Sequence, residues 1–266
     1  MRAGISRDET LDHHEIFPTP SSFDEAIFLL DTFLKQYRKG TLAAIAGGIP
    51  GPLDKEKNKL VRVPNLPLWS GIHIASRLQE QFNVPVFLEN DTALVGMGEA
   101  VKGAGKGHRI VAYLGIGTGV GGVRIVDGKI DENSLGFEPG HQIIDASSRF
   151  PDACGSFGHL EAYVSGSAIA KMYDVSAEAL DNPKVFEDLA KMLAAGINNV
   201  MVFWSPDVVV LGGSMMKRIS IERVKHHLRE ICTIFSPLPP LTLATLGDLG
   251  GLEGALNYLK SNRLDK

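Results

Sequence analysis

Two stretches of the sequence hold residues whose types and spacing could do chemistry. In the first, "LENDTA", Asn90 and Asp91 directly follow an apolar segment. If that segment is a buried strand of an α/β fold, both side chains lie at its carboxyl end, where such folds bind ligands. A carboxylate there can accept a proton from a substrate hydroxyl, and the adjacent amide can hold the substrate. The alternative is that one of the two residues merely caps the following helix.

The second stretch is "GIGTGVGG", residues 115–122. Apolar segments flank it, which predicts a hairpin whose glycine-rich turn brings backbone N–H groups and the Thr118 hydroxyl against a phosphate. No Gly-Lys-Ser/Thr follows, which excludes a Walker loop, and a strand follows where a dinucleotide fingerprint would need a helix. The alternative is a flexible turn without a ligand, although four alternating glycines are more than such a turn needs.

Two carboxylates and a histidine surround a further glycine-rich stretch. "FEPGH" contains Glu138 and His141, three residues apart, and Glu161 follows in "CGSFGHLEAYVSG". Together they suit a polyol ligand, which needs many hydrogen-bond partners, whereas a single Glu on a surface loop is usually just solvated. The interpretation depends on all of these residues occurring together.

These residues need a scaffold, and the sequence predicts strands that alternate with helices. This alternation over two segments predicts a two-lobed α/β protein. Helices are expected at 23–37, 71–82, 92–103, 163–173, 184–204, 220–235 and 252–262. Strands are expected at 2–6, 13–19, 84–91, 207–215 and 241–246, with one running into a Gly/Pro loop within 41–54 and a hairpin at 109–130.

The composition is that of a globular protein with a sizeable core: 266 residues, 44% hydrophobic and 22% charged. The formal net charge is −4 and no Lys/Arg run stands out, so we expect no nucleic-acid partner. The apolar runs are too short to span a membrane, and "MRAGISRDET" has no signal-peptide core. Two cysteines give no disulfide framework. Together these features indicate a cytoplasmic protein.

Five motifs occur in the order and spacing of one family: "LENDTALVGMGEA", "LGIGTGVGGVRI", "GFEPGH", "CGSFGHLEAYVSG" and "VVVLGGSM". They resemble the ROK family of sugar kinases and related repressors, and "GGIPGPLD" and "PNLPLW" look like its sugar-side loops. The resemblance covers nearly the whole chain. It implies an actin-like ATPase (ribonuclease H-like) fold with two lobes that close over sugar and ATP. The expected division is a smaller N-terminal lobe, 1–92, onto which the final helix at about 250–266 packs, and a larger lobe, 93–249.

The resemblance also implies a role for each motif residue. Asp91 would be the general base that takes the proton from a sugar hydroxyl, with ATP as phosphoryl donor and Mg²⁺ beside the nucleotide. The residues expected to hold the sugar are Asn65, Asn90, Asp91, Glu138, His141 and Glu161. Those expected to contact ATP are Gly117, Thr118 and Gly119 at the phosphates and Gly212 and Gly213 beside the adenosine.

The family's zinc knot joins the histidine of a Glu-x-x-His segment to three cysteines. The corresponding positions here are His141, Asp152, Cys154 and His159. All four side-chain types ligate tetrahedral zinc, so one interpretation is a structural Zn²⁺ that fixes His141. The other is a knot without metal, held by its glycine turns.

Family members begin with a strand and a Gly-Gly-Thr-Lys phosphate loop ahead of the position of "RAGIS", and this sequence starts after them. We therefore expect an N-terminally incomplete fold: either the true start lies upstream of Met1, or the chain is truncated. Two functions follow. The first is an ATP-dependent hexose or N-acetylhexosamine kinase of the glucokinase type, which the retention of Asp91 favours. The second is a non-catalytic sugar sensor or an inactive member. A homodimer is the assembly that the resemblance suggests.

Overall fold

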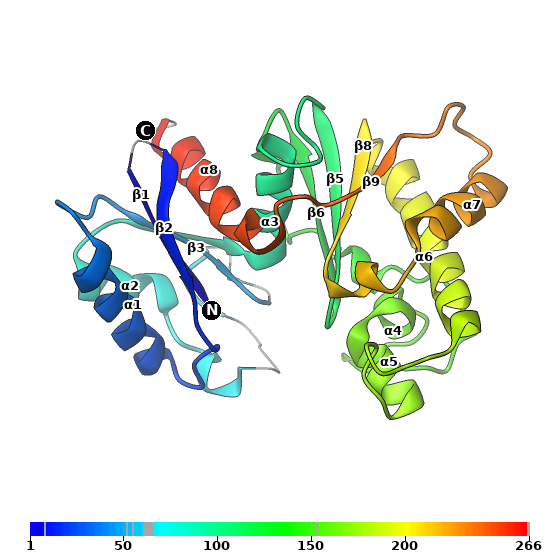
Figure 1. Ribbon diagram of the computed structural model, residues 1–266, viewed down its shortest axis with the longest axis horizontal. Helices are drawn as coiled ribbons and strands as arrows, with labels where there is room; N and C mark the ends of the chain where they lie inside the picture. The colour runs from blue at the N-terminus through cyan, green and yellow to red at the C-terminus, as the bar shows by residue number, and fades with distance from the viewer. Residues whose placement is uncertain (8, 52, 55, 61–65, 153, 265–266) are drawn as a thin grey trace. The chain divides into compact units, whose positions relative to one another are not determined.

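The computed structural model describes residues 1–266 except 8, 52, 55, 61–65, 153 and 265–266 (Figure 1). The chain folds into two compact units. Unit 1 comprises Met1–Gly98 together with Asp248–Lys266, and unit 2 comprises Glu99–Gly247. The C-terminal helix therefore belongs to the same unit as the N-terminal strands. In the described part of the chain, no helix is both long and apolar enough to cross a membrane.

Unit 1 contains two separate pairs of strands. Strands β1 (Arg2–Arg7) and β2 (Thr10–Ile16) pair antiparallel, as expected for two strands joined by a short polar turn. Strands β3 (Ile45–Ile49) and β4 (Val86–Asn90) pair parallel, with Ile49 opposite Asn90. A parallel pair needs a crossover connection, and this one contains the short helix η1 (Pro67–Trp69) and helix α2 (Ile74–Phe82).

Helix α1 (Phe23–Tyr37) completes one side of unit 1. Its start follows from the sequence, because the Ser22 hydroxyl accepts a hydrogen bond from the backbone N–H of Glu25 at 3.2 Å. Its apolar positions pack with those of α2 and β4 into one core. The buried residues of that core are Phe23, Ala26, Leu60, Trp69, Ile74, Leu78 and Leu88.

Helix α3 (Asp91–Val101) begins directly after β4, and it contacts helix α8 (Gly250–Leu264) through glycines (Figure 1). A Cβ atom on Gly254 would lie 1.7 Å from the carbonyl oxygen of Leu94, and one on Gly98 would lie 2.3 Å from that of Gly250. Only glycine permits backbones to approach this closely. Gly98 and Gly254 therefore allow α8 to pack closely against α3, the helix that begins with Asp91.

Unit 2 is built on one five-stranded sheet with the order β7-β6-β5-β8-β9. The strands are β5 (Ile110–Ile116), β6 (Val120–Val126), β7 (Lys129–Ile130), β8 (Val208–Gly212) and β9 (Leu241–Leu243). Strands β5 and β6 pair antiparallel from Ile110↔Val126 to Ile116↔Val120, which confirms the predicted hairpin. Strand β8 is buried along its whole length between two parallel neighbours, as its continuous apolar sequence predicts.

Two long helices cover the core of unit 2: α6 (Pro183–Trp204) and α7 (Ile221–Ile231), which pack against each other (Figure 1). Helix α7 ends earlier than the predicted 220–235. Cys232 leaves the helical conformation at φ −92° and ψ 86°, and the prolines that begin at Pro237 favour extended backbone before them.

The helix expected at 163–173 is divided into α4 (Glu161–Val164) and α5 (Gly166–Tyr173). Ser165 lies between them with extended backbone, φ −80° and ψ 156°, and its hydroxyl accepts a hydrogen bond from the N–H of Ala168. A serine in this position starts a new helix, so it outweighs the helical periodicity on either side. Three short helices, η2 (Pro139–His141), η3 (Ser214–Lys217) and η4 (Gly247–Leu249), lie in the connections.

The contact between α3 and α8 can be tested with a matched pair of substitutions. Gly254→Ala should lower the free energy of unfolding by about 1–3 kcal/mol, because the added methyl group pushes two backbones apart. Gly251→Ala is the control: its Cβ would lie 3.7 Å from the nearest atom, a methyl of Val95, so the helix preference for alanine should leave it neutral or stabilising. Urea unfolding followed by circular dichroism measures both. Equal effects would contradict the close approach.

Candidate active site

The end of β4 presents two adjacent polar residues, as the sequence predicts. Strand β4 ends at Asn90 and α3 begins at Asp91. Strand β3 passes close by, since a Cβ on Gly48 would lie 2.8 Å from the Cα of Asp91. Glycine at position 48 therefore gives Asp91 the room to lie beside the neighbouring strand.

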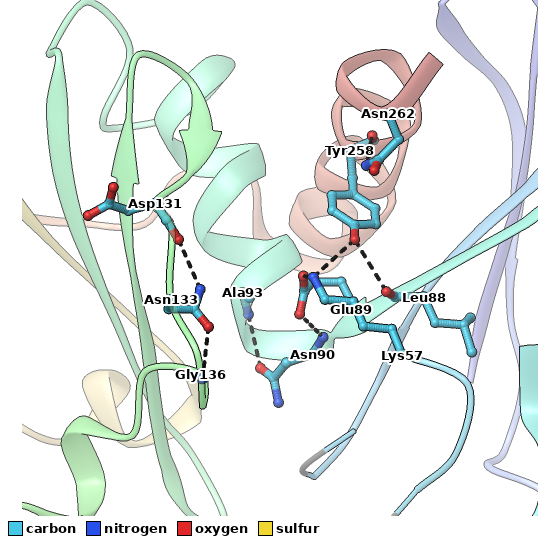
Figure 2. A network of polar contacts seen from close by, with 10 residues as sticks. All are labelled: Lys57, Leu88, Glu89, Asn90, Ala93, Asp131, Asn133, Gly136, Tyr258 and Asn262. Atoms are coloured by element: carbon cyan, nitrogen blue, oxygen red, sulfur yellow. Dashed lines mark hydrogen bonds and ion pairs between the residues drawn. The ribbon is translucent and has the colours of Figure 1, made fainter. Parts of the chain in front are cut away.

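Asn90 and Asp91 make different contacts. The Asn90 side-chain oxygen accepts a hydrogen bond from the N–H of Ala93 at 3.1 Å, so Asn90 caps α3 (Figure 2). The Asp91 carboxylate accepts one from the N–H of Thr92 at 2.7 Å, and the Thr92 hydroxyl lies 3.4 Å from the same oxygen, Oδ1. Burial raises the pKa of Asp91, against the opposing effect of the Thr92 hydrogen bonds. A carboxylate with a raised pKa is a stronger base.

A second layer of polar contacts holds the end of β4 (Figure 2). Glu89 accepts a hydrogen bond from the N–H of Asn90 at 2.9 Å and forms an ion pair with Lys57. The Lys57 ammonium also donates to the Tyr258 hydroxyl at 3.2 Å, and that hydroxyl lies 3.4 Å from the carbonyl oxygen of Leu88. The sequence analysis missed these residues, because they come from a loop, a strand and the C-terminal helix with no common motif.

In unit 2, the glycine-rich turn between β5 and β6 is anchored through its carbonyl groups. The carbonyl of Gly117 accepts a hydrogen bond from the N–H of Gly166 at 2.8 Å, and that of Thr118 accepts one from the Ser167 hydroxyl at 2.7 Å. The carbonyl of Gly119 accepts one from the N–H of Gly117 at 2.9 Å. Among the described residues, no atom lies within 4 Å of a Cβ placed on Gly117, so they leave this side of the turn open.

Glu161, the first residue of α4, contacts the same turn. Its carboxylate oxygen Oε2 accepts a hydrogen bond from the N–H of Val120 at 2.8 Å. A Cβ on Gly119 would lie 2.6 Å from that oxygen, so glycine leaves the space that the carboxylate occupies. The structure therefore brings together Glu161 and the glycine-rich turn, a contact that the sequence analysis did not foresee.

Glu138 and His141 lie at the two ends of η2, which packs on β6. Both line a pocket of about 410 Å³ in unit 2. Burial raises the pKa of Glu138; the charge of Glu161 adds to the shift and His141 opposes it. Asn199 and Trp204 of α6 line the same pocket. The sequence analysis assigned these two only to a helix, because helical periodicity does not show which residues face a cavity.

Three of the four predicted zinc ligands lie together. The Asp152 oxygen Oδ2 lies 2.6 Å from Nδ1 of His159 and 3.2 Å from Nδ1 of His141, and these two nitrogens are 3.2 Å apart. The fourth, Cys154, is exposed and does not belong to this group. Two imidazole nitrogens and a carboxylate oxygen are ligands that Zn²⁺ accepts, so the grouped residues fit the ion.

The Asp152 carboxylate also organises the loop around it. Its other oxygen, Oδ1, accepts hydrogen bonds from the N–H groups of Cys154 at 2.8 Å and Ser156 at 2.9 Å. Burial alone would raise the pKa of Asp152, but the N–H groups of Ser156 and Cys154 and the His159 ring together hold it below its usual value. Asp152 is thus an anion at neutral pH, as a zinc ligand must be.

The two glycines expected beside the adenosine have a structural reason of their own. A Cβ on Gly212 would lie 2.2 Å from the Tyr113 hydroxyl oxygen. Gly213 has φ +92°, and its Cβ would lie 2.1 Å from the carbonyl oxygen of Ile116. Packing against β5 therefore requires both glycines, whatever else they contact. The predicted sugar contact Asn65 lies outside the described residues.

The raised pKa of Asp91 has a measurable effect on stability. Asp91 has its ordinary pKa in the unfolded protein and a raised pKa in the folded protein. At pH values between these two, the folded protein binds more protons than the unfolded one, so the free energy of unfolding falls as the pH rises. Asp91→Asn should therefore raise the free energy of unfolding at pH 7. The gain should vanish at about pH 3, where Asp91 is protonated in both states.

Asn90→Ala is the companion variant, and it should cost about 0.5–2 kcal/mol at both pH values through the lost cap. Urea unfolding at the two pH values distinguishes these effects. A gain for Asp91→Asn that is independent of pH would contradict the explanation by partial burial of the carboxylate.

Comparisons with known proteins bear on both units. The ROK family model matches residues 4–262. The ROK hexokinase from Thermus thermophilus superposes with a TM-score of 0.86 at 27% identity, over 98% of this chain and 95% of that one. An N-acetylgalactosamine kinase from Shewanella sp. (strain ANA-3) is 29% identical over 220 aligned positions, and the match covers 72% of this chain and 70% of the kinase.

The xylose repressor of Bacillus subtilis (strain 168) is 30% identical over 212 aligned positions, and the match covers 73% of this chain. The match spans only 54% of the repressor. The family thus includes both kinases and repressors. The mixed helix and sheet structure matches the solved hexokinase, and it confirms the predicted actin-like ATPase fold. With a family match over nearly its entire length, the chain belongs to the ROK family.

Proposed function

We propose that this chain is an ATP-dependent sugar kinase that phosphorylates a hydroxyl of a hexose or N-acetylhexosamine. The observation that carries the proposal is Asp91: a partly buried carboxylate with a raised pKa at the carboxyl end of a parallel strand. The similarity to a hexokinase and an N-acetylgalactosamine kinase supports it.

Asp91 is the general base of the proposed reaction. Phosphoryl transfer needs a positioned hydroxyl, neutralised charge on the phosphates and a base at the nucleophile. The raised pKa of Asp91 makes its carboxylate better matched to a proton from the sugar hydroxyl. Because the Asn90 oxygen caps α3, its amide nitrogen is the group that would donate to a neighbouring sugar oxygen.

The other proposed sugar contacts are Asn65 and three residues of unit 2. Glu138 and Glu161 would accept hydrogen bonds from sugar hydroxyls. Nδ1 of His141 lies against Asp152 and His159, so its other ring nitrogen, Nε2, is the one that would bind a hydroxyl. His141 would thus join the sugar site to the knot.

The glycine-rich turn would receive the phosphates of ATP, which supplies the phosphoryl group as its magnesium complex. The carbonyl groups of the turn are used in anchoring, and the side of Gly117 is open. The N–H groups of Thr118 and Gly119 and the Thr118 hydroxyl are the donors available to a phosphate. Gly212 and Gly213, at the end of β8, would lie beside the adenosine.

A zinc ion in the knot is part of the proposal. His141, Asp152 and His159 would hold it, with Cys154 or a water molecule as fourth ligand. The ion would be structural: it would fix Nδ1 of His141 and so orient the ring that faces the sugar.

A non-catalytic sugar-binding protein is the second candidate, and the similarity to the xylose repressor favours it. The two candidates share sugar binding and differ in phosphoryl transfer. An experiment on turnover therefore separates them, while a binding experiment alone does not.

The decisive experiment measures ADP release by this chain with ATP, magnesium and a panel of hexoses and N-acetylhexosamines. We expect sugar-dependent turnover that Asp91→Asn lowers by about 100-fold or more, with little change in sugar affinity, because the amide keeps the shape and loses the base. Asp127→Asn, in the exposed turn after β6, is the control and should retain full activity.

Turnover that survives in Asp91→Asn would contradict the assigned base. Absence of turnover with every sugar, together with a sugar-induced rise in melting temperature, would support the second candidate.

Metal analysis tests the knot. Protein purified without added zinc should contain about one equivalent for the knot, and Asp152→Asn should lose it, since the amide lacks the negative charge that binds the ion. Cys154→Ser should retain the ion if water can take the fourth position. A zinc content below about a tenth of an equivalent in the wild type would refute the structural ion.

A further inference from the structure

A second cluster of side chains that could hold a metal lies on helix α7, which contains none of the residues assigned above. His226, His227 and Glu230 each present one ligand atom, and these atoms lie within 4.8 Å of one another. The His227 side chain is only 14% exposed, and the other two face solvent. The arrangement leaves one side open for water.

The spacing of these atoms suits an ion between them. Zn²⁺ binds imidazole nitrogen at about 2.0–2.1 Å, so the ligands of a tetrahedral site lie roughly 3.3–3.4 Å apart. Nδ1 of His227 lies 3.2 Å from one oxygen of Glu230, and Nε2 of His226 lies 3.5 Å from the other. Both distances from Glu230 are therefore close to the ligand spacing of such a site.

Glu187 of α6 contacts the far side of the His227 ring and so supports the cluster. Nε2 of His227 lies 2.7 Å from the Glu187 carboxylate of α6, so that nitrogen carries the proton and donates it. Arg223 holds Glu187 from the other side with two guanidinium nitrogens. A carboxylate behind a histidine fixes its tautomer and turns the opposite nitrogen, here Nδ1, toward the metal.

We propose that Nε2 of His226, Nδ1 of His227 and the carboxylate of Glu230 form a binding site for a divalent transition-metal ion, best suited to Zn²⁺, with water in the remaining position. Two imidazoles favour ions of this class over Mg²⁺ or Ca²⁺, which prefer oxygen ligands. The Glu187 contact makes the bound ion a link between α6 and α7 in unit 2. The site is independent of the proposed kinase activity.

The test is a titration of this chain, free of metal, with Co²⁺, followed by its visible absorption, and with Zn²⁺ by calorimetry. His226→Ala and Glu230→Gln should each bind one equivalent fewer than the wild type, whether or not the knot also binds an ion. Glu187→Gln should keep the site but weaken it by about tenfold, the usual effect of losing an outer-shell partner. Glu222→Gln, an exposed residue of the same helix, is the matched control and should bind like the wild type.

The metal-free variants should have the circular dichroism spectrum of the wild type, because His226 and Glu230 lie at the surface. Zinc should raise the melting temperature of His226→Ala less than that of the wild type. Equal stoichiometry and affinity in wild type, His226→Ala and Glu230→Gln would overturn the proposal. The three side chains would then form only imidazolium–carboxylate ion pairs.

Discussion

Close backbone contact around Asp91 is the constraint on which unit 1 depends. Strand β3 passes on one side, and the space at position 48 admits only glycine. Gly254 of α8 contacts the backbone of Leu94, about one turn into α3. The Asp91 carboxylate is partly buried here, so it loses part of its hydration, and the packing around it offsets that cost. Stability given up at one residue in exchange for a reactive group is a common feature of enzyme active sites.

The sequence predicted most of the scaffold because its signals are local. The polar pair Asn90 and Asp91 followed an apolar strand, and the glycine-rich hairpin lay between apolar segments. The break at Ser165 was missed because a short polar cap interrupted an otherwise helical pattern. Over so few residues, the hydrogen bond of a capping side chain sets the helix boundary, and the apolar periodicity does not reveal it.

The contacts that tune the site could not be predicted in this way. Lys57 reaches Glu89 across 32 positions, and Glu161 reaches the N–H of Val120 across 41. Neither pair lies within one helix or hairpin, so no spacing rule brings its members together. The knot was intermediate: the family resemblance indicated which residues gather, but only coordinates separate Cys154 from the two histidines and Asp152.

The contact between Glu161 and the turn links positions 119 and 161 in evolution. The carboxylate occupies the space that any side chain at position 119 would need. A substitution at Gly119 would therefore displace Glu161, and loss of Glu161 would free position 119 to vary. The two positions, 42 apart in the sequence, should evolve as a pair, so an alignment of relatives should show glycine at one accompanied by glutamate at the other.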